Sequence, residues 1–261
     1  MKLLFVFLLF IQFAFTEENK PMVIDIYPSA DSIPANILRF YIKFSHPMQE
    51  TGILKHIHLS DENGKNITGV FFDNDYELWN KERTVVTILV DPGRVKKGLF
   101  ANNTMGWAFD VGKTYALTVD SLLLDFNDKH LEKSYTKSFM AVSADTIAPD
   151  IKNWTVNVPL SKTNMPLKIN FKDNIDHISA CTLIQVIDKN KKVISGNIFL
   201  KNSEKEWELI PNNHWEKGSY TIIVSSHLED IVANSIYGVF DHRIGTLSLV
   251  GNLQYLQFQV K

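Results

Sequence analysis

Two histidines separated by one residue, His56 and His58, are the strongest candidate metal ligands in the chain. Side chains two residues apart on a β-strand point to the same face, so both imidazoles could reach one ion. A catalytic zinc normally takes three protein ligands and leaves a fourth position open. The other six histidines are scattered and lack a carboxylate at ligand spacing. The pair predicts no more than a metal site. A secreted metal-dependent hydrolase that uses this site is therefore a minor alternative.

Oxygen ligands offer a second candidate site, at Asp230 and Asn234. Oxygen-rich loops on secreted modules sometimes bind Ca²⁺ weakly, so we expect no cofactor and keep a weak calcium site here as the minor alternative. The alternative is a turn in which the Asp230 carboxylate accepts hydrogen bonds from backbone amides. The stretch DENG at residues 61–64 lacks the closing glutamate of a calcium loop and favours a hairpin turn.

Nucleophilic catalysis finds no support in the sequence. There is no Gly-x-Ser-x-Gly elbow and no glycine-rich loop that could hold a phosphate. The single cysteine, Cys181, lies in the strand-like run 179–184, where we expect it to act as a small buried apolar residue. We therefore predict a protein that is not an enzyme.

An internal repeat determines the elements that position these residues. Residues 44–69 align without a gap on residues 171–196, and residues 112–125 align on residues 217–230. The two offsets are 127 and 105 residues, so the first copy carries 22 extra residues between its matching parts. One structural unit therefore occurs twice.

The extra residues predict a binding loop at about 91–112. Loops of this length inside a compact domain tend to be functional, and a sandwich carries its binding residues on loops. The candidate partner-binding residues are Arg94, Lys96, Lys97, Phe100 and Trp107. The alternative is that the loop covers an edge of its own sandwich.

Apolar residues alternate with a period of two, which predicts β-strands rather than helices. Leu38, Phe40, Ile42 and Phe44 face a core, whereas Arg39, Tyr41 and Lys43 face water. Short strands joined by polar turns indicate antiparallel β-sandwiches, and we expect no amphipathic helix of any length. The predicted domains span residues 21–142 and 146–261, joined by a linker that limits their swing. Residues 253–260 again have a strand pattern and should complete the second sheet.

The first sixteen residues predict a cleaved secretory signal peptide. Lys2 precedes an apolar run that is too short to span a bilayer, and small residues follow at positions 14 and 16. A single cysteine excludes intramolecular disulfides, which suits an exported bacterial protein. The formal net charge is −2, and charges of both signs are interspersed, so we expect no nucleic-acid partner and no membrane span in the mature chain.

The segment PANILRFYIKFSHPM at residues 34–48 resembles the opening of the bacterial Ig-like domain first named from S-layer proteins. DPGRVKKG at 91–98 and GKTY at 112–115 extend the resemblance. The second half is similar to the companion domain of an exported two-domain bacterial family without an established activity, through WELIP at 207–211, HW at 214–215, GSY at 218–220 and LED at 228–230. The resemblance implies an all-β chain of two tandem antiparallel Ig-like β-sandwiches, and it carries no catalytic residues.

One departure from this pattern lies in the turn after LED. Such domains usually place glycine before the asparagine, but here Ala233 precedes Asn234, and the first copy has Asp128. Because alanine is strained at positive φ, we expect either another turn conformation or an alignment slip of one residue.

Together these observations predict a non-catalytic module exported to the periplasm, cell surface or medium. Its role would be cell-envelope structure, adhesion or protein interaction, with an envelope protein or glycan as partner. The alternative is a carbohydrate-binding module that uses the loop around Trp107, because an aromatic plane stacks on the apolar face of a sugar.

Overall fold

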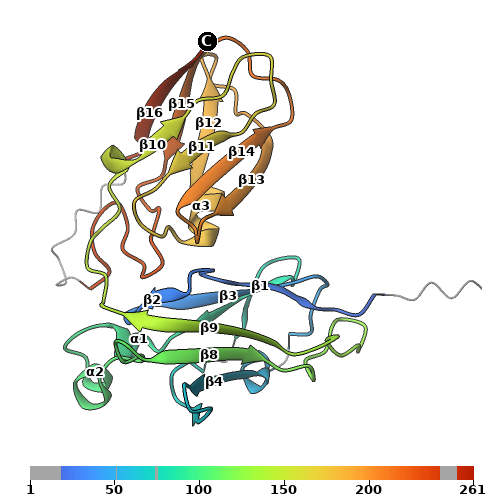
Figure 1. Ribbon diagram of the computed structural model, residues 1–261, viewed down its shortest axis with the longest axis vertical. Coiled ribbons are helices and arrows are strands. Elements are labelled where there is room, and N and C mark those ends of the chain that lie inside the picture. Colours follow the sequence, from blue (N-terminus) through green and yellow to red (C-terminus); the bar gives the residue numbers. More distant parts are fainter. Residues whose placement is uncertain (1–18, 51, 74–75, 242–251) are drawn as a thin grey trace, which may run out of the picture.

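Two β-sandwiches follow one another in the computed structural model, which describes residues 19–50, 52–73, 76–241 and 252–261. The predicted signal peptide at residues 1–16 lies outside the described residues. The second sandwich stands on the first, with helix α3 at the lower end of the second facing β2 and β3 of the first (Figure 1). Within the described ranges, no helix is long and apolar enough to cross a membrane.

The first sandwich has one sheet in the order β1–β3–β7–β6 and another in the order β2–β9–β8–β4–β5. Its pairs are antiparallel except for β2 and β9, which run parallel. The strands are β1 (Val23–Tyr27), β2 (Ser32–Pro34), β3 (Arg39–Phe44), β4 (Ile57–Asp61), β5 (Asn66–Ile67), β6 (Leu78–Trp79), β7 (Val85–Leu89), β8 (Thr114–Val119) and β9 (Tyr135–Val142). Short helical segments are η1 (Ile53–His56), α1 (Pro92–Val95) and α2 (Phe100–Met105).

The second sandwich has sheets in the orders β10–β11–β14–β13 and β12–β15–β16. In chain order the first, second, fifth and fourth strands form one sheet and the third, sixth and seventh form the other, which is the immunoglobulin constant-type arrangement. The elements are η2 (Ile151–Asn153), β10 (Thr155–Asn157), β11 (Leu167–Asn170), α3 (His177–Leu183), β12 (Ile184–Asp188), β13 (Gly196–Lys201), β14 (Glu206–Pro211), β15 (Gly218–Val224) and β16 (Gln254–Val260). The all-β fold and the strand at residues 253–260 are confirmed.

The core of each sandwich contains a group of three packed aromatic rings, and the two groups match. In the first, Tyr115 stacks on Phe139 with ring centroids 5.7 Å apart, and Phe109 meets Tyr115 edge-on at 5.1 Å. In the second, Tyr220 stacks on Phe258 at 5.4 Å and Trp215 meets Tyr220 edge-on at 5.3 Å. The internal repeat of the sequence is therefore a repeat of core packing, and it aligns β9 with β16.

One turn geometry recurs at four aspartates, two in each copy. In each, Oδ1 of the aspartate accepts the backbone N–H groups two and four residues later at 2.8–2.9 Å, and this holds for Asp61, Asp125, Asp188 and Asp230. The residue three positions after each aspartate has a left-handed φ: 75° at Gly64, 60° at Asp128, 64° at Lys191 and 67° at Ala233.

The expectation of a different turn or an alignment slip at Ala233 is therefore wrong. Alanine adopts the strained conformation there, and its buried methyl group belongs to the apolar cluster of the first sandwich. Burial of that methyl group favours alanine over glycine at a position where glycine would relieve the strain.

Two further expectations are wrong. Residues 177–183 form the helix α3, not a strand, because the Asp176 side chain caps it by accepting the backbone N–H of Ser179 at 2.8 Å. Cys181 is consequently half-buried rather than fully buried, and burial raises the pKa of its thiol. Second, the outward side of β3 does not all face water: Tyr41 is only 6% exposed, because the second sandwich covers it.

Candidate interaction surface and domain junction

Residues 91–112, named here the platform, form two short helices rather than an irregular loop. Asp91 caps α1 by accepting the Gly93 N–H at 2.8 Å, and Pro92 occupies the first helical position, where no N–H is needed. Val95 is buried and anchors α1 to the core of the first sandwich. α2 ends at Gly106, whose φ of 71° turns the chain back.

Arg94 braces the platform from inside. Its Nη2 donates to the Trp107 carbonyl at 2.5 Å and its Nε to the Gly106 carbonyl at 3.4 Å. Asn102 Nδ2 in turn donates to the Arg94 carbonyl at 2.9 Å, which joins α2 to α1. The Arg94 guanidinium is thus engaged within the platform.

The other predicted residues of the platform divide into two groups. Lys96 lies over the Phe240 ring of the second sandwich with Nζ 4.4 Å from its centroid, and Lys97 lies 5.9 Å from the ring of the half-buried Trp107. Phe100 instead projects into solvent, with 82% of its surface exposed. The platform carries three further exposed apolar side chains, Leu99, Met105 and Val111. The platform therefore presents an apolar surface on a braced support.

His56 ends η1 and His58 lies on β4, so they do not share one strand as predicted, but both imidazoles contact Asp120. His56 Nδ1 lies 3.0 Å from Asp120 Oδ1 and His58 Nε2 lies 2.9 Å from Oδ2. Burial would raise the pKa of the Asp120 carboxyl, but the hydrogen bonds from His58 and His56 outweigh it and lower that pKa. Among the described residues, no group of three or more His, Cys, Asp or Glu side chains is placed to hold a metal ion.

Asp230 and Asn234 lie together in the buried turn described above. Asn234 Nδ2 donates to Asp230 Oδ2 at 2.9 Å, and Asn234 Oδ1 accepts the Phe240 N–H at 2.9 Å. Burial, with a contribution from nearby Asp145, raises the pKa of Asp230 to about 7. The oxygens proposed for calcium are therefore hydrogen-bonded to the protein itself.

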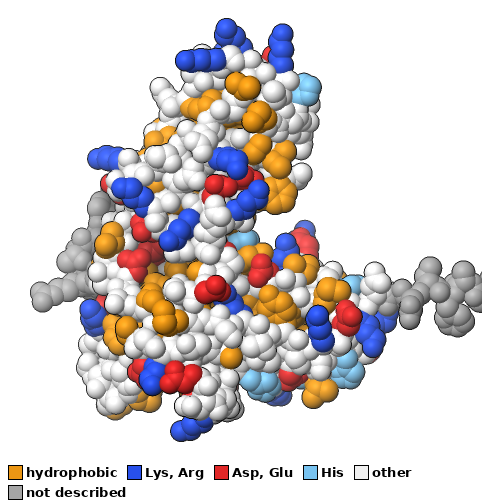
Figure 2. Space-filling model, viewed as in Figure 1, with side chains coloured by type: hydrophobic (Ala, Val, Ile, Leu, Met, Phe, Trp, Pro, Cys, Tyr) orange, Lys and Arg blue, Asp and Glu red, His pale blue; other side chains and the backbone are white. Residues whose placement is uncertain are grey.

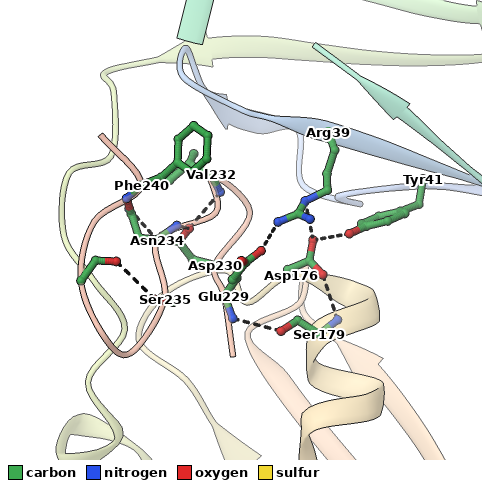
Figure 3. A network of polar contacts seen from close by, with 11 residues as sticks. Arg39, Tyr41, Asp176, Ser179, Glu229, Asp230, Val232, Asn234, Ser235 and Phe240 are labelled. Atoms are coloured by element: carbon green, nitrogen blue, oxygen red, sulfur yellow. Dashed lines mark hydrogen bonds and ion pairs between the residues drawn. The ribbon is translucent and has the colours of Figure 1, made fainter. Parts of the chain in front are cut away.

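A polar network between the sandwiches is a feature that the sequence analysis did not identify (Figure 3). Tyr41 donates to Asp176 Oδ2 at 2.8 Å, and Arg39 Nε lies 3.6 Å from the same oxygen. The Arg39 guanidinium also forms an ion pair with Glu229. Burial and Asp176 raise the pKa of the Tyr41 phenol, which keeps it protonated as a donor. Two outward residues of β3 thus bind two carboxylates of the second sandwich.

A second contact lies beside the first and uses Glu204. This carboxylate is 2% exposed, accepts the Ser29 N–H at 2.9 Å and lies 3.7 Å from His177 Nδ1. The His177 ring stacks on Tyr27 with centroids 3.5 Å apart. Asn202, Ser203 and Glu204 all have φ between 52° and 61°. Three consecutive left-handed residues are costly, and the junction contacts of Glu204 offset that strain.

The linker is attached to both sandwiches. Asn36 forms a two-way clamp on Asp145, donating from Nδ2 to its carbonyl at 2.7 Å and accepting its N–H at 2.9 Å. Two residues later, the Ile147 carbonyl accepts Asn234 Nδ2 at 3.4 Å. The linker, the network and the Glu204 contact hold the two sandwiches in one arrangement, with an open angle between them on one side (Figure 2).

A cleft of about 600 Å³ opens on the first sandwich, away from the predicted residues. Exposed aromatic side chains Phe72 and Tyr76 line it together with the carboxylates Glu50, Asp73 and Glu77. No spacing rule pointed to it, because its lining comes from three separate segments of the chain.

No protein-family model and no curated protein matches this chain. Among solved structures it is similar to the S-layer protein rSbsC, at 14% identity and a TM-score of 0.32, over 93% of this chain and 26% of that one. It is also similar to a fragment of Escherichia coli alpha-2-macroglobulin, at 8% identity and a TM-score of 0.30, over 93% of this chain and 90% of that one. A third similar structure is the N-terminal Ig1-2 module of the Drosophila receptor protein tyrosine phosphatase DLAR. It has 11% identity and a TM-score of 0.27, over 93% of this chain and 100% of that one. The chain spans about a quarter of the S-layer protein.

Proposed function

We propose that this chain is a non-catalytic, exported Ig-like module of the cell envelope that binds a protein partner through its platform. The single observation that carries the proposal is Phe100, a large apolar side chain that is 82% exposed on a braced helical support. Exposed aromatic residues that are held in place are typical anchors of protein interfaces.

The bracing matters because a preorganised surface loses little conformational entropy when it binds. The hydrogen bonds of Arg94 and Asn102 fix α1 against α2 before any partner arrives. Contact of Lys96 with Phe240 also ties the platform to the second sandwich. A partner on the platform would therefore meet both sandwiches in a fixed arrangement, which suits a structural or adhesive role.

Burial of Phe100 and of the other exposed apolar side chains of the platform would supply the binding free energy. At about 25 cal/mol per Å² of apolar surface, full burial of one such side chain gives about 1.5–3 kcal/mol. Lys97, which is exposed beside Trp107, would lie at the polar rim and could guide an acidic partner. Loss of Phe100 alone should therefore weaken binding by more than tenfold.

Crosslinking in cells, followed by pull-down and mass spectrometry, tests this proposal. The native protein should yield one abundant partner, crosslinked through Lys96 or Lys97, and Phe100→Asp should lose it. Phe126→Asp is the matched control, because Phe126 is 65% exposed at another loop of the same sandwich. Recovery of the partner with the Phe100 variant, or of no partner with the native protein, would contradict the proposal.

The carbohydrate-binding alternative makes a separate prediction. Trp107 is half-buried and Lys97 lies over its ring, so less of the indole plane is open to a sugar. Retention on cell-wall polysaccharide that disappears in Trp107→Ala but persists in Phe100→Asp would favour the glycan as partner.

A further inference from the structure

The strand β16 (Gln254–Val260) forms an edge of the second sandwich. It pairs with β15 over all seven of its residues, and the sheet order β12–β15–β16 places it last. Within the described residues, no strand pairs with its other side. Every second residue of an edge strand directs its N–H and C=O away from the sheet, so β16 offers a row of unpaired backbone groups.

The corresponding edge of the first sandwich is protected. β9 aligns with β16 through the stacked pairs Tyr115–Phe139 and Tyr220–Phe258. One end of β9 is covered by β2, which pairs Ser32–Pro34 with Met140–Val142. Farther along β9, the inward-pointing Lys137 donates to the Ser29 carbonyl at 3.0 Å. A short covering strand and an inward charge are both devices that prevent edge-to-edge pairing.

Among the described residues of the second sandwich, β16 has neither device. The residue that corresponds to Lys137 is Leu256, which packs partly buried against the second core. In place of a covering strand, Ser161 makes one hydrogen bond to the Lys261 carbonyl at 2.6 Å, beyond the end of β16. The two copies of the repeat therefore differ at this edge.

The side chains of β16 are also compatible with a second copy of the same strand. Tyr255, Gln257 and Gln259 face outward, and none of the seven residues is charged. Like charges directly opposite each other destabilise a strand pair. Because β16 has no charged side chain, two copies of it would not repel each other in this way. The small net charge of the chain, −2, adds little repulsion between two copies.

We propose that two copies of this protein pair through β16, antiparallel and two-fold symmetric, with Gln257 on the axis. This register places each of the seven residues opposite a β16 residue of the other copy and leaves Lys261 outside the pair. Gln257 lies opposite its own equivalent, Tyr255 opposite Gln259, and Leu256 opposite Phe258. The two three-stranded sheets become one continuous sheet, and the partly buried Leu256 gains an apolar neighbour. β16 lies on the outer flank of the second sandwich, so the first sandwich does not block the approach (Figure 1).

Sedimentation velocity of the purified protein over a range of concentrations tests this pairing. The native protein should show a concentration-dependent dimer. Gln257→Lys and Gln257→Glu should each reduce dimerisation at least tenfold, because like charges then meet on the axis. An equimolar mixture of the two variants should recover a dimer. Thr221→Lys is the matched control: Thr221 neighbours Gln257 on the same outer face but lies on the central strand β15, and this variant should dimerise like the native protein.

Three results would overturn the proposal. The native protein could stay monomeric up to its solubility limit, or Gln257→Lys could dimerise unchanged. Hydrogen exchange adds the third: protection of all β16 amides in a dilute, monomeric sample would mean that another part of the same chain covers the edge. Far-UV circular dichroism of each variant establishes that it is folded, so a lost dimer reports on the edge and not on unfolding.

Discussion

The phenol of Tyr41 in the first sandwich donates a 2.8 Å hydrogen bond to Oδ2 of Asp176, whose Oδ1 caps helix α3 of the second sandwich. One carboxylate thus serves both the start of a helix and the contact between the sandwiches. Because Asp176 is only 3% exposed, water does not replace a lost partner easily. The junction and the local fold of α3 are therefore energetically linked.

Replacing Tyr41 with phenylalanine should lower the free energy of unfolding by about 1–3 kcal/mol, since the variant leaves a buried carboxylate oxygen without its donor. Chemical denaturation followed by tryptophan fluorescence measures the change. Tyr76→Phe is the control, because Tyr76 is 79% exposed and should change stability by less than about 0.5 kcal/mol. Equal effects of the two substitutions would contradict the role given to Tyr41.

Asn36→Ala should release the linker without unfolding either sandwich. The variant loses both hydrogen bonds of the clamp on Asp145, at a cost of about 1–2 kcal/mol. Hydrogen exchange should show faster exchange of the Asp145 amide, while the amides of β8 and β15 stay protected. Unchanged exchange at Asp145 would show that the clamp does not hold the linker.

The contribution of Asp230 to stability should fall as the pH rises from about 4 to about 7. Burial raises the pKa of Asp230 to about 7, so in this window the folded state holds a proton that the unfolded state has released. Raising the pH therefore favours the unfolded state, and the effect levels off above the folded pKa. Asp230→Asn should flatten this slope in urea titrations across the window, while Asp125→Asn, in the matching turn of the first sandwich, should keep it.

Arg94→Ala should loosen the platform while the core of the first sandwich persists. The variant frees the Gly106 and Trp107 carbonyls that Arg94 binds. Limited proteolysis should then cut within residues 96–107 at least several times faster than in the native protein. Lys97→Ala, at an exposed residue of the same segment, provides the control. Resistance of the Arg94 variant would mean that packing of Val95 alone holds the platform.

The sequence predicted the strands well because the period of two and the repeat are local signals. Leu38, Phe40 and Phe44 are buried as expected, and the turns at Asp61 and Asp188 have one geometry. It did not predict α3, since the cap by Asp176 competes with the strand propensity of the residues that follow. It also missed the junction: Arg39 and Tyr41 have the pattern of solvent-facing residues, and only their approach to Asp176 and Glu229, far away in the chain, reveals their role.

For the candidate site too, the sequence predicted local features but not contacts between distant residues. The 22 extra residues in the first copy of the repeat were the only sequence signal for the platform. In the structure, Phe100 is exposed there. The pattern could not separate residues that brace the platform, such as Arg94, from residues that face a partner. Spacing predicted His56 and His58 on one strand, but His56 ends η1, and the contact that the two histidines share, Asp120, lies 62 residues after His58.

A distance measurement between the sandwiches tests the central claim, a fixed arrangement of the two, most directly. Spin labels at Lys65 and Lys189, in matching exposed turns of the two sandwiches, would be read by pulsed electron paramagnetic resonance in a Cys181→Ser background. We predict one narrow distance distribution that broadens when Arg39 and Tyr41 are both replaced by alanine. A broad distribution in the otherwise native protein would contradict the account.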